Sequence, residues 1–210
     1  MGGRALLDLP ARSLLQTMLV AGCGAVFLSA GLPHLGPQGR FGPANQVTLL
    51  RAVLVALLTG AIGAAPDGRV VWVATIVAAA AALLDAVDGW LARRLGAETA
   101  YGARFDMETD ALLVLVLSVL VLQGGKAGPW ILVSGLLRYA FVLAGILTPR
   151  FRRPLPPSLR RKAIAALQMV LLISALSPLL QRPYSDGVAV LAVMTLAVSF
   201  AIDLRLLWRP

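Results

Sequence analysis

The sequence contains one cysteine, Cys23, and one histidine, His34. A single cysteine excludes an intrachain disulfide framework and a zinc site built from cysteines, and it gives no information on the redox compartment. The histidine lies in a segment rich in glycine and proline, which favours a structural role. Acid–base or metal chemistry in this chain must therefore rely mainly on carboxylates.

Charged residues are also scarce, at 14% of 210 residues, whereas 59% are hydrophobic. The mean hydropathy is +0.82. A soluble domain of this length cannot bury so much apolar surface, because the buried fraction grows only slowly with chain length. The composition predicts an all-α integral membrane protein, since a helix satisfies its own backbone hydrogen bonds in lipid.

Seven apolar segments are long enough, or nearly so, for the roughly 20 helical residues that cross a bilayer. They lie at about 13–32, 45–65, from Arg69 into the stretch that begins at Asp85, 103–123, 129–148, 162–180 and 187–207. The first could be a signal peptide, but its apolar stretch is long and the cleavage site after it is loose, so we expect a retained helix. We therefore divide the chain into an N-terminal extension with an extra transmembrane helix (1–42) and a transmembrane domain (43–210).

Basic residues outnumber acidic ones, 19 to 10. Beside apolar spans, such residues more often set topology or meet lipid phosphates than bind nucleic acid, and we expect no nucleic-acid partner. Alternating the loops through seven spans places twelve Lys and Arg on the face that holds 93–104 and five on the other. The positive-inside rule then assigns that face to the cytoplasm of a bacterial-type inner or cell membrane.

Acidic residues are concentrated in one place: six of the ten lie between Asp85 and Asp110. Asp85 and Asp88 are three residues apart at the end of the third segment. Asp106 and Asp110 are four apart at the start of the fourth. Both spacings put a pair on one helix face, and the short connector between the helices lets the two pairs face each other.

Four converging carboxylates repel one another unless cations lie between them. Oxygen-only ligands favour Mg²⁺ or Mn²⁺ over zinc, and two such ions suit displacement at phosphorus. Gly89, Ala92 and Gly102 have no side chain or a small one, which leaves space near the carboxylates. The planar guanidinium of Arg93 can bind a phosphate group. For either pair alone, a solvated or salt-bridged role is as good an explanation; the full constellation is more specific.

The stretch resembles the signature of the CDP-alcohol phosphotransferase (CDP-alcohol phosphatidyltransferase) family, class I, with every spacing met. The matching positions are Asp85, Asp88, Gly89, Ala92, Arg93, Gly102, Asp106 and Asp110. Upstream, "PANQVTLLR" is similar to the family's entry to its first helix at Asn45, Thr48 and Arg51, with one residue inserted after Pro43. The resemblance covers about 43–205.

The resemblance implies a six-helix transmembrane bundle, commonly a homodimer, that transfers a substituted phosphate from a CDP-linked donor to an alcohol and releases CMP. It implies that Asp85, Asp88 and Asp106 bind two divalent ions, and that Asp110 adjoins them as the general base. The donor-binding set would be Asn45, Thr48, Arg51, Gly89, Ala92, Arg93 and Gly102. The segment at 13–32 departs from the family's usual short interfacial helix.

The acceptor alcohol is left open by the signature. "SLRRKAIAALQM" resembles a family segment with Lys162 at its lysine and Arg161 where glycine is usual. Arg138 lies inside a span, where a charge needs a partner. These three residues favour an anionic acceptor such as glycerol 3-phosphate, with CDP-diacylglycerol as donor, whereas the basic run at 150–153 is explained by topology alone.

Other functions remain compatible with the sequence. Within the family, the acceptor could be inositol phosphate or phosphatidylglycerol, as in cardiolipin synthesis, or the enzyme could transfer from CDP-choline or CDP-ethanolamine to diacylglycerol. From a different class, a divalent-cation transporter or channel would also use carboxylates within a membrane. That alternative predicts acids at mid-depth on several helices, whereas here they cluster at one end.

Overall fold

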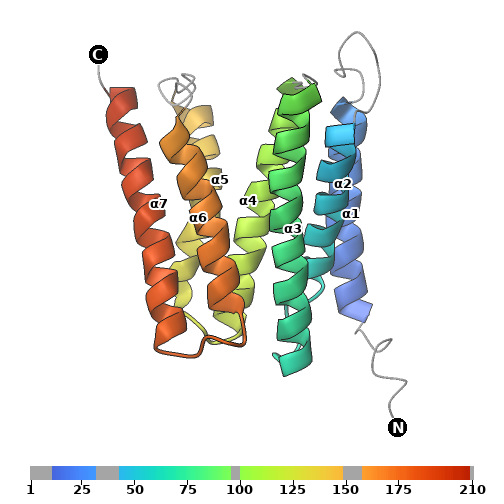
Figure 1. Cartoon of the computed structure of the whole chain (residues 1–210), viewed down its shortest axis with the longest axis vertical. Helices are drawn as coiled ribbons and strands as arrows, with labels where there is room; N and C mark the ends of the chain where they lie inside the picture. The colour runs from blue at the N-terminus through green and yellow to red at the C-terminus, as the bar shows by residue number, and fades with distance from the viewer. Residues whose placement is uncertain (1–10, 32–42, 96–99, 149–157, 209–210) are drawn as a thin grey trace. The chain divides into compact units, whose positions relative to one another are not determined.

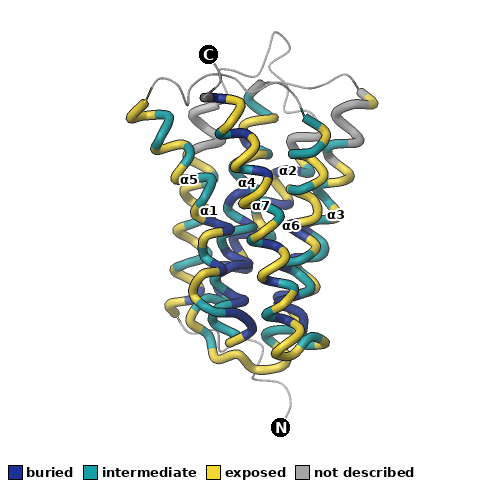
Figure 2. The backbone as a smooth tube through the Cα atoms, turned by 90° about the vertical axis from the view of Figure 1, so that its left-hand side faces the viewer, coloured by how far each residue is buried: buried dark blue, intermediate teal, exposed yellow. Residues whose placement is uncertain are grey.

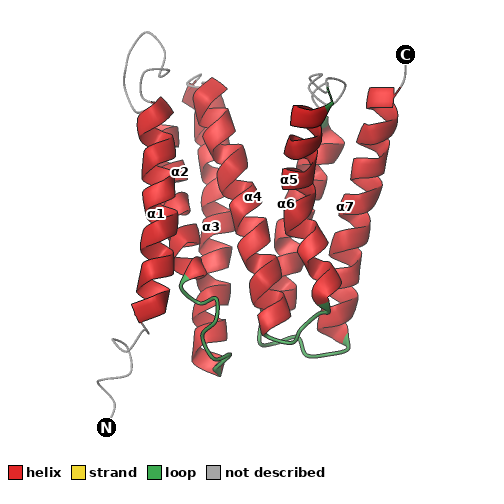
Figure 3. Cartoon of the chain, turned by 180° about the vertical axis from the view of Figure 1, so that it is seen from behind, coloured by secondary structure: helices red, strands yellow, loops and turns green. Residues whose placement is uncertain are grey.

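The computed structural model describes residues 11–31, 43–95, 100–148 and 158–208. Within these ranges the chain forms seven α-helices and one short 3-10 helix, with no strand (Figure 3). The elements are α1 (Ala11–Gly31), α2 (Pro43–Thr59), α3 (Gly68–Leu95), α4 (Ala100–Gln123), η2 (Pro129–Ile131), α5 (Leu132–Leu147), α6 (Leu159–Leu176) and α7 (Tyr184–Trp208). The all-helical prediction is confirmed, and each expected segment corresponds to one α-helix.

The second helix is shorter than the apolar run predicts: α2 ends at Thr59, whereas the apolar segment continues to about residue 65. A chain of turns follows, with the amide nitrogen of Gly60 bound to the carbonyl of Leu57 at 3.1 Å. Gly63 adopts a φ of +82°, which side chains disfavour, and Pro66 cannot donate a backbone hydrogen bond. The backbone conformation of Gly63 and the missing amide donor of Pro66 therefore favour an end of α2 before the apolar run is complete.

Among the residues that the structure describes, three helices are long and apolar enough to cross a membrane, over Gly68–Val87, Pro129–Leu147 and Tyr184–Leu207. Two shorter apolar stretches are Ala11–Val26 and Gln46–Thr59. Large apolar side chains are exposed along the helices. Figure 2 marks the exposed residues in yellow along the backbone. Such extensive apolar exposure is unfavourable in water and suits lipid, which identifies an integral membrane protein.

The chain divides into two compact units, Met1–Val116 and Leu117–Pro210. In the first, α2 packs against both α1 and α3 (Figure 1). The chain lies close to α1 directly after the end of α2. A Cβ added at Gly60 would lie only 2.8 Å from Oγ1 of Thr17. On α3, Ala78 and Ala81 are fully buried. Small side chains of this kind let helix backbones approach closely in membranes.

In the second unit α6 and α7 pack along each other (Figure 1). The rings of Phe141 and Phe200 meet edge to face at a centroid distance of 5.4 Å, which joins α5 to α7. Lys126, in the turn after α4, binds the chain that follows α6: its Nζ donates to the carbonyl of Leu180 and, at 3.0 Å, to Oε1 of Gln181. The turn and the α6–α7 connector are thereby held together.

Candidate functional site

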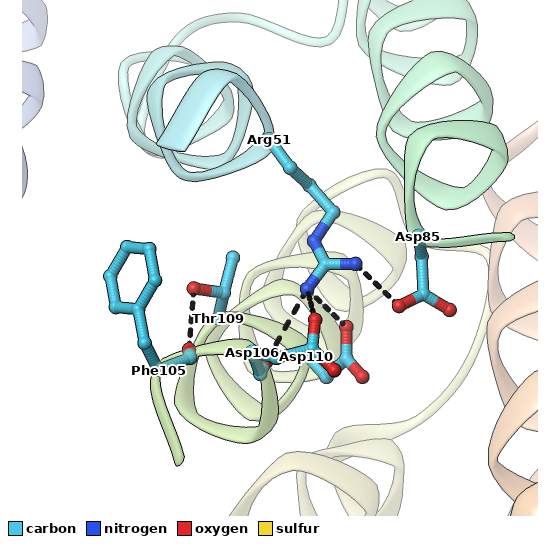
Figure 4. A network of polar contacts seen from close by, with 6 residues as sticks. All are labelled: Arg51, Asp85, Phe105, Asp106, Thr109 and Asp110. Carbon is cyan, nitrogen blue, oxygen red and sulfur yellow. Dashed lines mark hydrogen bonds and ion pairs between the residues drawn. The ribbon is translucent and has the colours of Figure 1, made fainter. Parts of the chain in front are cut away.

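Three aspartates and one arginine converge in the first unit. Arg51 comes from α2, Asp85 from α3, and Asp106 and Asp110 from α4 (Figure 4). The guanidinium of Arg51 forms ion pairs with Asp85 and Asp106, and its Nη2 lies 3.4 Å from Oδ1 of Asp110. The guanidinium of Arg51 therefore contacts carboxylates from two different helices.

Helical periodicity explains why these side chains meet. On α3, Ala74, Ala78 and Ala81 are buried, and Asp85 continues that row four residues later. A spacing of three or four residues keeps side chains on one helix face. The apolar contact face of α3 thus ends in a carboxylate.

The same construction applies to α2 and α4. Arg51 belongs to a buried row with Thr48, Val55 and Leu58. On α4, Asp106 and Asp110 precede the buried Leu113 and Leu117 at the spacings of a single face. Each helix presents an apolar stripe that becomes polar toward the same end, where the four side chains gather.

Burial differs sharply across the cluster. The side chain of Arg51 is 0% exposed, whereas those of Asp85, Asp106 and Asp110 are 41%, 39% and 34% exposed. Arg51 also donates to the backbone carbonyl of Asp106 at 3.4 Å. The carboxylates therefore form the open side of the cluster, and the guanidinium forms its covered side.

The three carboxylates fit a hard divalent cation. One oxygen from each of Asp85, Asp106 and Asp110 lies within 4.8 Å of the other two. Opposite ligand oxygens of a Mg²⁺ ion are about 4.2 Å apart at the usual bond lengths of 2.0–2.1 Å, so small side-chain rotations would bring these oxygens to one ion. The oxygen-only donor set is the one that Mg²⁺ and Mn²⁺ prefer.

Thr109 lies between the two aspartates of α4 and faces inward. Its hydroxyl donates to the carbonyl of Phe105 at 2.9 Å, and both residues are buried (Figure 4). Since a threonine hydroxyl bound to its own helix needs no other partner, it does not compete for the aspartates.

The predicted donor-binding residues lie on the same three helices. Thr48 is buried one turn before Arg51, and Gly89 and Gly102 are half-buried on α3 and α4. The side chains of Asn45, Asp88, Ala92 and Arg93 lie outside the described residues, although their backbones belong to α2 and α3.

The predicted acceptor-binding residues belong to the second unit. Arg138 is half-buried on α5, and the first turn of α6 carries the half-buried Arg161 and the exposed Lys162. Gln168, seven residues beyond Arg161 and so on the same helix face, is 2% exposed. Neither polar atom of its side chain has a hydrogen-bond partner in the part of the chain that the structure describes.

Two of these polar contacts are not predicted from the sequence. The family resemblance assigns Arg51 to the donor and not to the aspartates, although an arginine inside an apolar run signals a need for a carboxylate partner. The other is the contact of Asp203, whose carboxylate binds Arg160. An aspartate near the end of an apolar span, with a basic residue at the start of the preceding one, is the corresponding signal.

Comparison with known proteins agrees with the sequence motif. No solved structure matches the chain. The family model for CDP-alcohol phosphatidyltransferase matches residues 42–202, which include Arg51, Asp85, Asp106 and Asp110. The chain therefore belongs to the CDP-alcohol phosphatidyltransferase family of membrane transferases.

Proposed function

We propose that this protein transfers a phosphatidyl group from CDP-diacylglycerol to an alcohol in a Mg²⁺-dependent reaction of phospholipid synthesis, with release of CMP. The observation that carries the proposal is the meeting of Asp85, Asp106 and Asp110, in a chain that matches the family. Family membership favours this enzyme over a cation channel or transporter.

Asp85, Asp88 and Asp106, with Asp110 adjoining, would hold Mg²⁺ or Mn²⁺, as two ions. When bound, these ions neutralise the donor diphosphate and stabilise charge that develops on the leaving group. The chain itself contributes carboxylate oxygens that are held in position by the helices. Because these oxygens are preorganised, little free energy is needed to bring them together in each turnover.

The proposed reaction is a displacement at the phosphorus that carries diacylglycerol. The acceptor hydroxyl oxygen forms a new bond to this phosphorus, the bond to the bridging oxygen breaks, and CMP leaves with that electron pair. Asp110 would take the proton from the attacking hydroxyl, which general bases in enzymes do at hydrogen-bond distance. Its partial exposure, 34%, leaves its carboxylate reachable by an acceptor.

The cytidine and diphosphate portions of the donor would lie along α2, α3 and α4. Gly89 and Gly102 remove side chains beside the carboxylates, and Ala92 adds only a methyl group. Arg93 would supply a bidentate contact to phosphate, and Asn45 and Thr48 would close the pocket from α2.

The acceptor we favour is glycerol 3-phosphate, held by Arg138, Arg161 and Lys162. The buried amide of Gln168 supports a polar ligand beside Arg161, because buried amides are normally hydrogen-bonded. Inositol phosphate, phosphatidylglycerol, and diacylglycerol with CDP-choline or CDP-ethanolamine are the competing substrates. We further propose a homodimer whose active site faces the cytoplasm of a bacterial-type inner or cell membrane.

The decisive experiment uses purified full-length protein in lipid nanodiscs with CDP-diacylglycerol, Mg²⁺ and each acceptor in turn. Release of CMP, strongest with glycerol 3-phosphate, is the expected result. CMP release only with an unphosphorylated acceptor would refute the acceptor assignment. Divalent-cation flux in proteoliposomes, with no CMP from any donor and acceptor, would instead support a transporter.

A further inference from the structure

Arg51 lies within an apolar helix, and its guanidinium contacts three carboxylates from α3 and α4. We infer that Arg51 is a positioning residue that holds Asp85, Asp106 and Asp110 from the buried side and orders them for divalent cations, without contacting the donor. This inference rests on the proposed function. It differs from the donor-binding role that the family resemblance implies for Arg51.

Burial is the first support. The Arg51 side chain has no exposed surface, while the three carboxylates are each between 34% and 41% exposed. Since the carboxylates have exposed surface and the guanidinium has none, a donor or cation that enters from outside meets the carboxylates first. Figure 4 shows the Arg51 side chain extending from α2 to the three carboxylates. Direct contact between Arg51 and a diphosphate would require the carboxylates to move aside.

The second support is the pattern of contacts. The ion pairs to Asp85, Asp106 and Asp110 all use Oδ1. An ionised carboxylate accepts through both of its oxygens and can serve about four donors, so one arginine contact leaves room for a metal ion on the same group. The planar guanidinium fixes the direction of each contact, which a lysine ammonium cannot do.

Charge is the third support. Three ionised carboxylates and one guanidinium carry a net charge of −2, which a single divalent cation neutralises. Without the guanidinium, three carboxylates within 4.8 Å of one another would repel. Arg51 thereby keeps the three carboxylates close together.

The test measures metal binding alone, with no donor or acceptor present. Full-length protein in nanodiscs is titrated with Mn²⁺, and the free ion is followed by electron paramagnetic resonance. Arg51→Gln is expected to raise the Kd for Mn²⁺ by about tenfold or more, as loss of a group that orients metal ligands generally does. Arg51→Lys, which keeps the charge but reaches fewer carboxylates, is expected to raise it by a smaller factor.

Arg160→Gln is the matched control, since it removes an arginine that is ion-paired to Asp203 in the second unit. Its Kd for Mn²⁺ is expected to equal that of the wild type. Unchanged or tighter Mn²⁺ binding in Arg51→Gln would overturn the inference. If Arg51→Gln does not fold, wild-type Mn²⁺ affinity in Arg51→Lys would overturn it equally. Because no turnover is measured, the outcome stands whether or not CMP is ever released.

Discussion

The guanidinium of Arg160 forms an ion pair with the carboxylate of Asp203, and this pair connects the first turn of α6 to the last part of α7. Arg160 also donates to the hydroxyl and the carbonyl of Ser199, at 2.6 and 2.8 Å. Arg160, the first of the three consecutive basic residues at 160–162, is thus engaged within the fold. The acceptor proposal concerns the other two, Arg161 and Lys162.

Asp203→Asn should lower the free energy of unfolding by about 1–3 kcal/mol. It leaves the Arg160 charge without its carboxylate, a change that costs 3–5 kcal/mol in a fully buried pair and less here because Arg160 is partly exposed. Thermal unfolding in detergent measures the effect. Asp186→Asn is the control: its pair with Arg182 is exposed and 3.8 Å long, so a loss below about 1 kcal/mol is expected. Equal losses in the two variants would refute a stabilising role for Asp203.

Asp110→Asn should reduce CMP release by about 10²-fold or more, because an amide cannot accept the proton of the attacking hydroxyl. Binding of Mn²⁺ should weaken less than in Asp106→Asn, since Asp106 is proposed to act only as a metal ligand, whereas Asp110 adjoins the ions and serves as the general base. Steady-state turnover and Mn²⁺ titration together separate the two roles. Substantial activity in Asp110→Asn would remove the general-base assignment.

Removal of divalent cations should abolish turnover and destabilise the protein. Excess EDTA is expected to stop CMP release, and Mg²⁺ or Mn²⁺ to restore it. A ligand at 100 times its Kd stabilises the folded state by about 2.7 kcal/mol, which a thermal scan detects. Potassium chloride at the same ionic strength controls for screening. An unfolding temperature that responds equally to both salts would argue against a specific cation site.

Arg138→Ala and Arg161→Ala should each raise the KM for a phosphorylated acceptor by about tenfold or more, since a charge-assisted hydrogen bond contributes about 1.5–3 kcal/mol. The KM for CDP-diacylglycerol should stay the same. Arg205→Ala removes an exposed arginine from the last turn of α7 and serves as the control. If all three variants behave alike, the anion-site proposal fails.

Lys126→Met should destabilise the protein by about 1–3 kcal/mol, because the carbonyl of Leu180 and the amide of Gln181 lose a buried donor. Burial lowers the pKa of the Lys126 ammonium. The folded chain therefore releases this proton at a lower pH than the unfolded chain. As a result, the free energy of unfolding of the wild type rises with pH between the two pKa values. Chemical unfolding across alkaline pH should show that rise in the wild type and not in Lys126→Met.

Much of the architecture is predictable from the apolar runs, because each helix needs a continuous hydrophobic stretch to lie in lipid. The aspartate spacings likewise predict shared faces, and the structure brings Asp85, Asp106 and Asp110 together as expected. The early end of α2 is not predictable from hydropathy, since Gly60 and Gly63 end the helix within an apolar run.

Contacts between distant helices are the part that the sequence leaves open. Arg51 is 34 residues from Asp85 and 55 from Asp106, and Arg160 is 43 from Asp203. Spacing along one helix determines which face a side chain occupies, but the partner of that face depends on how the helices pack. A buried arginine therefore indicates that a carboxylate partner exists, but it does not identify that partner.

The complete burial of Arg51 also has a consequence for biogenesis. An arginine at the centre of a nascent transmembrane helix costs about 2.5–3.5 kcal/mol on insertion scales, which makes α2 alone a poor substrate for partition into lipid. Its carboxylate partners are synthesised later, on α3 and α4. We therefore expect stable integration of α2 to depend on the synthesis of α3 and α4, which carry the carboxylates that pair with Arg51.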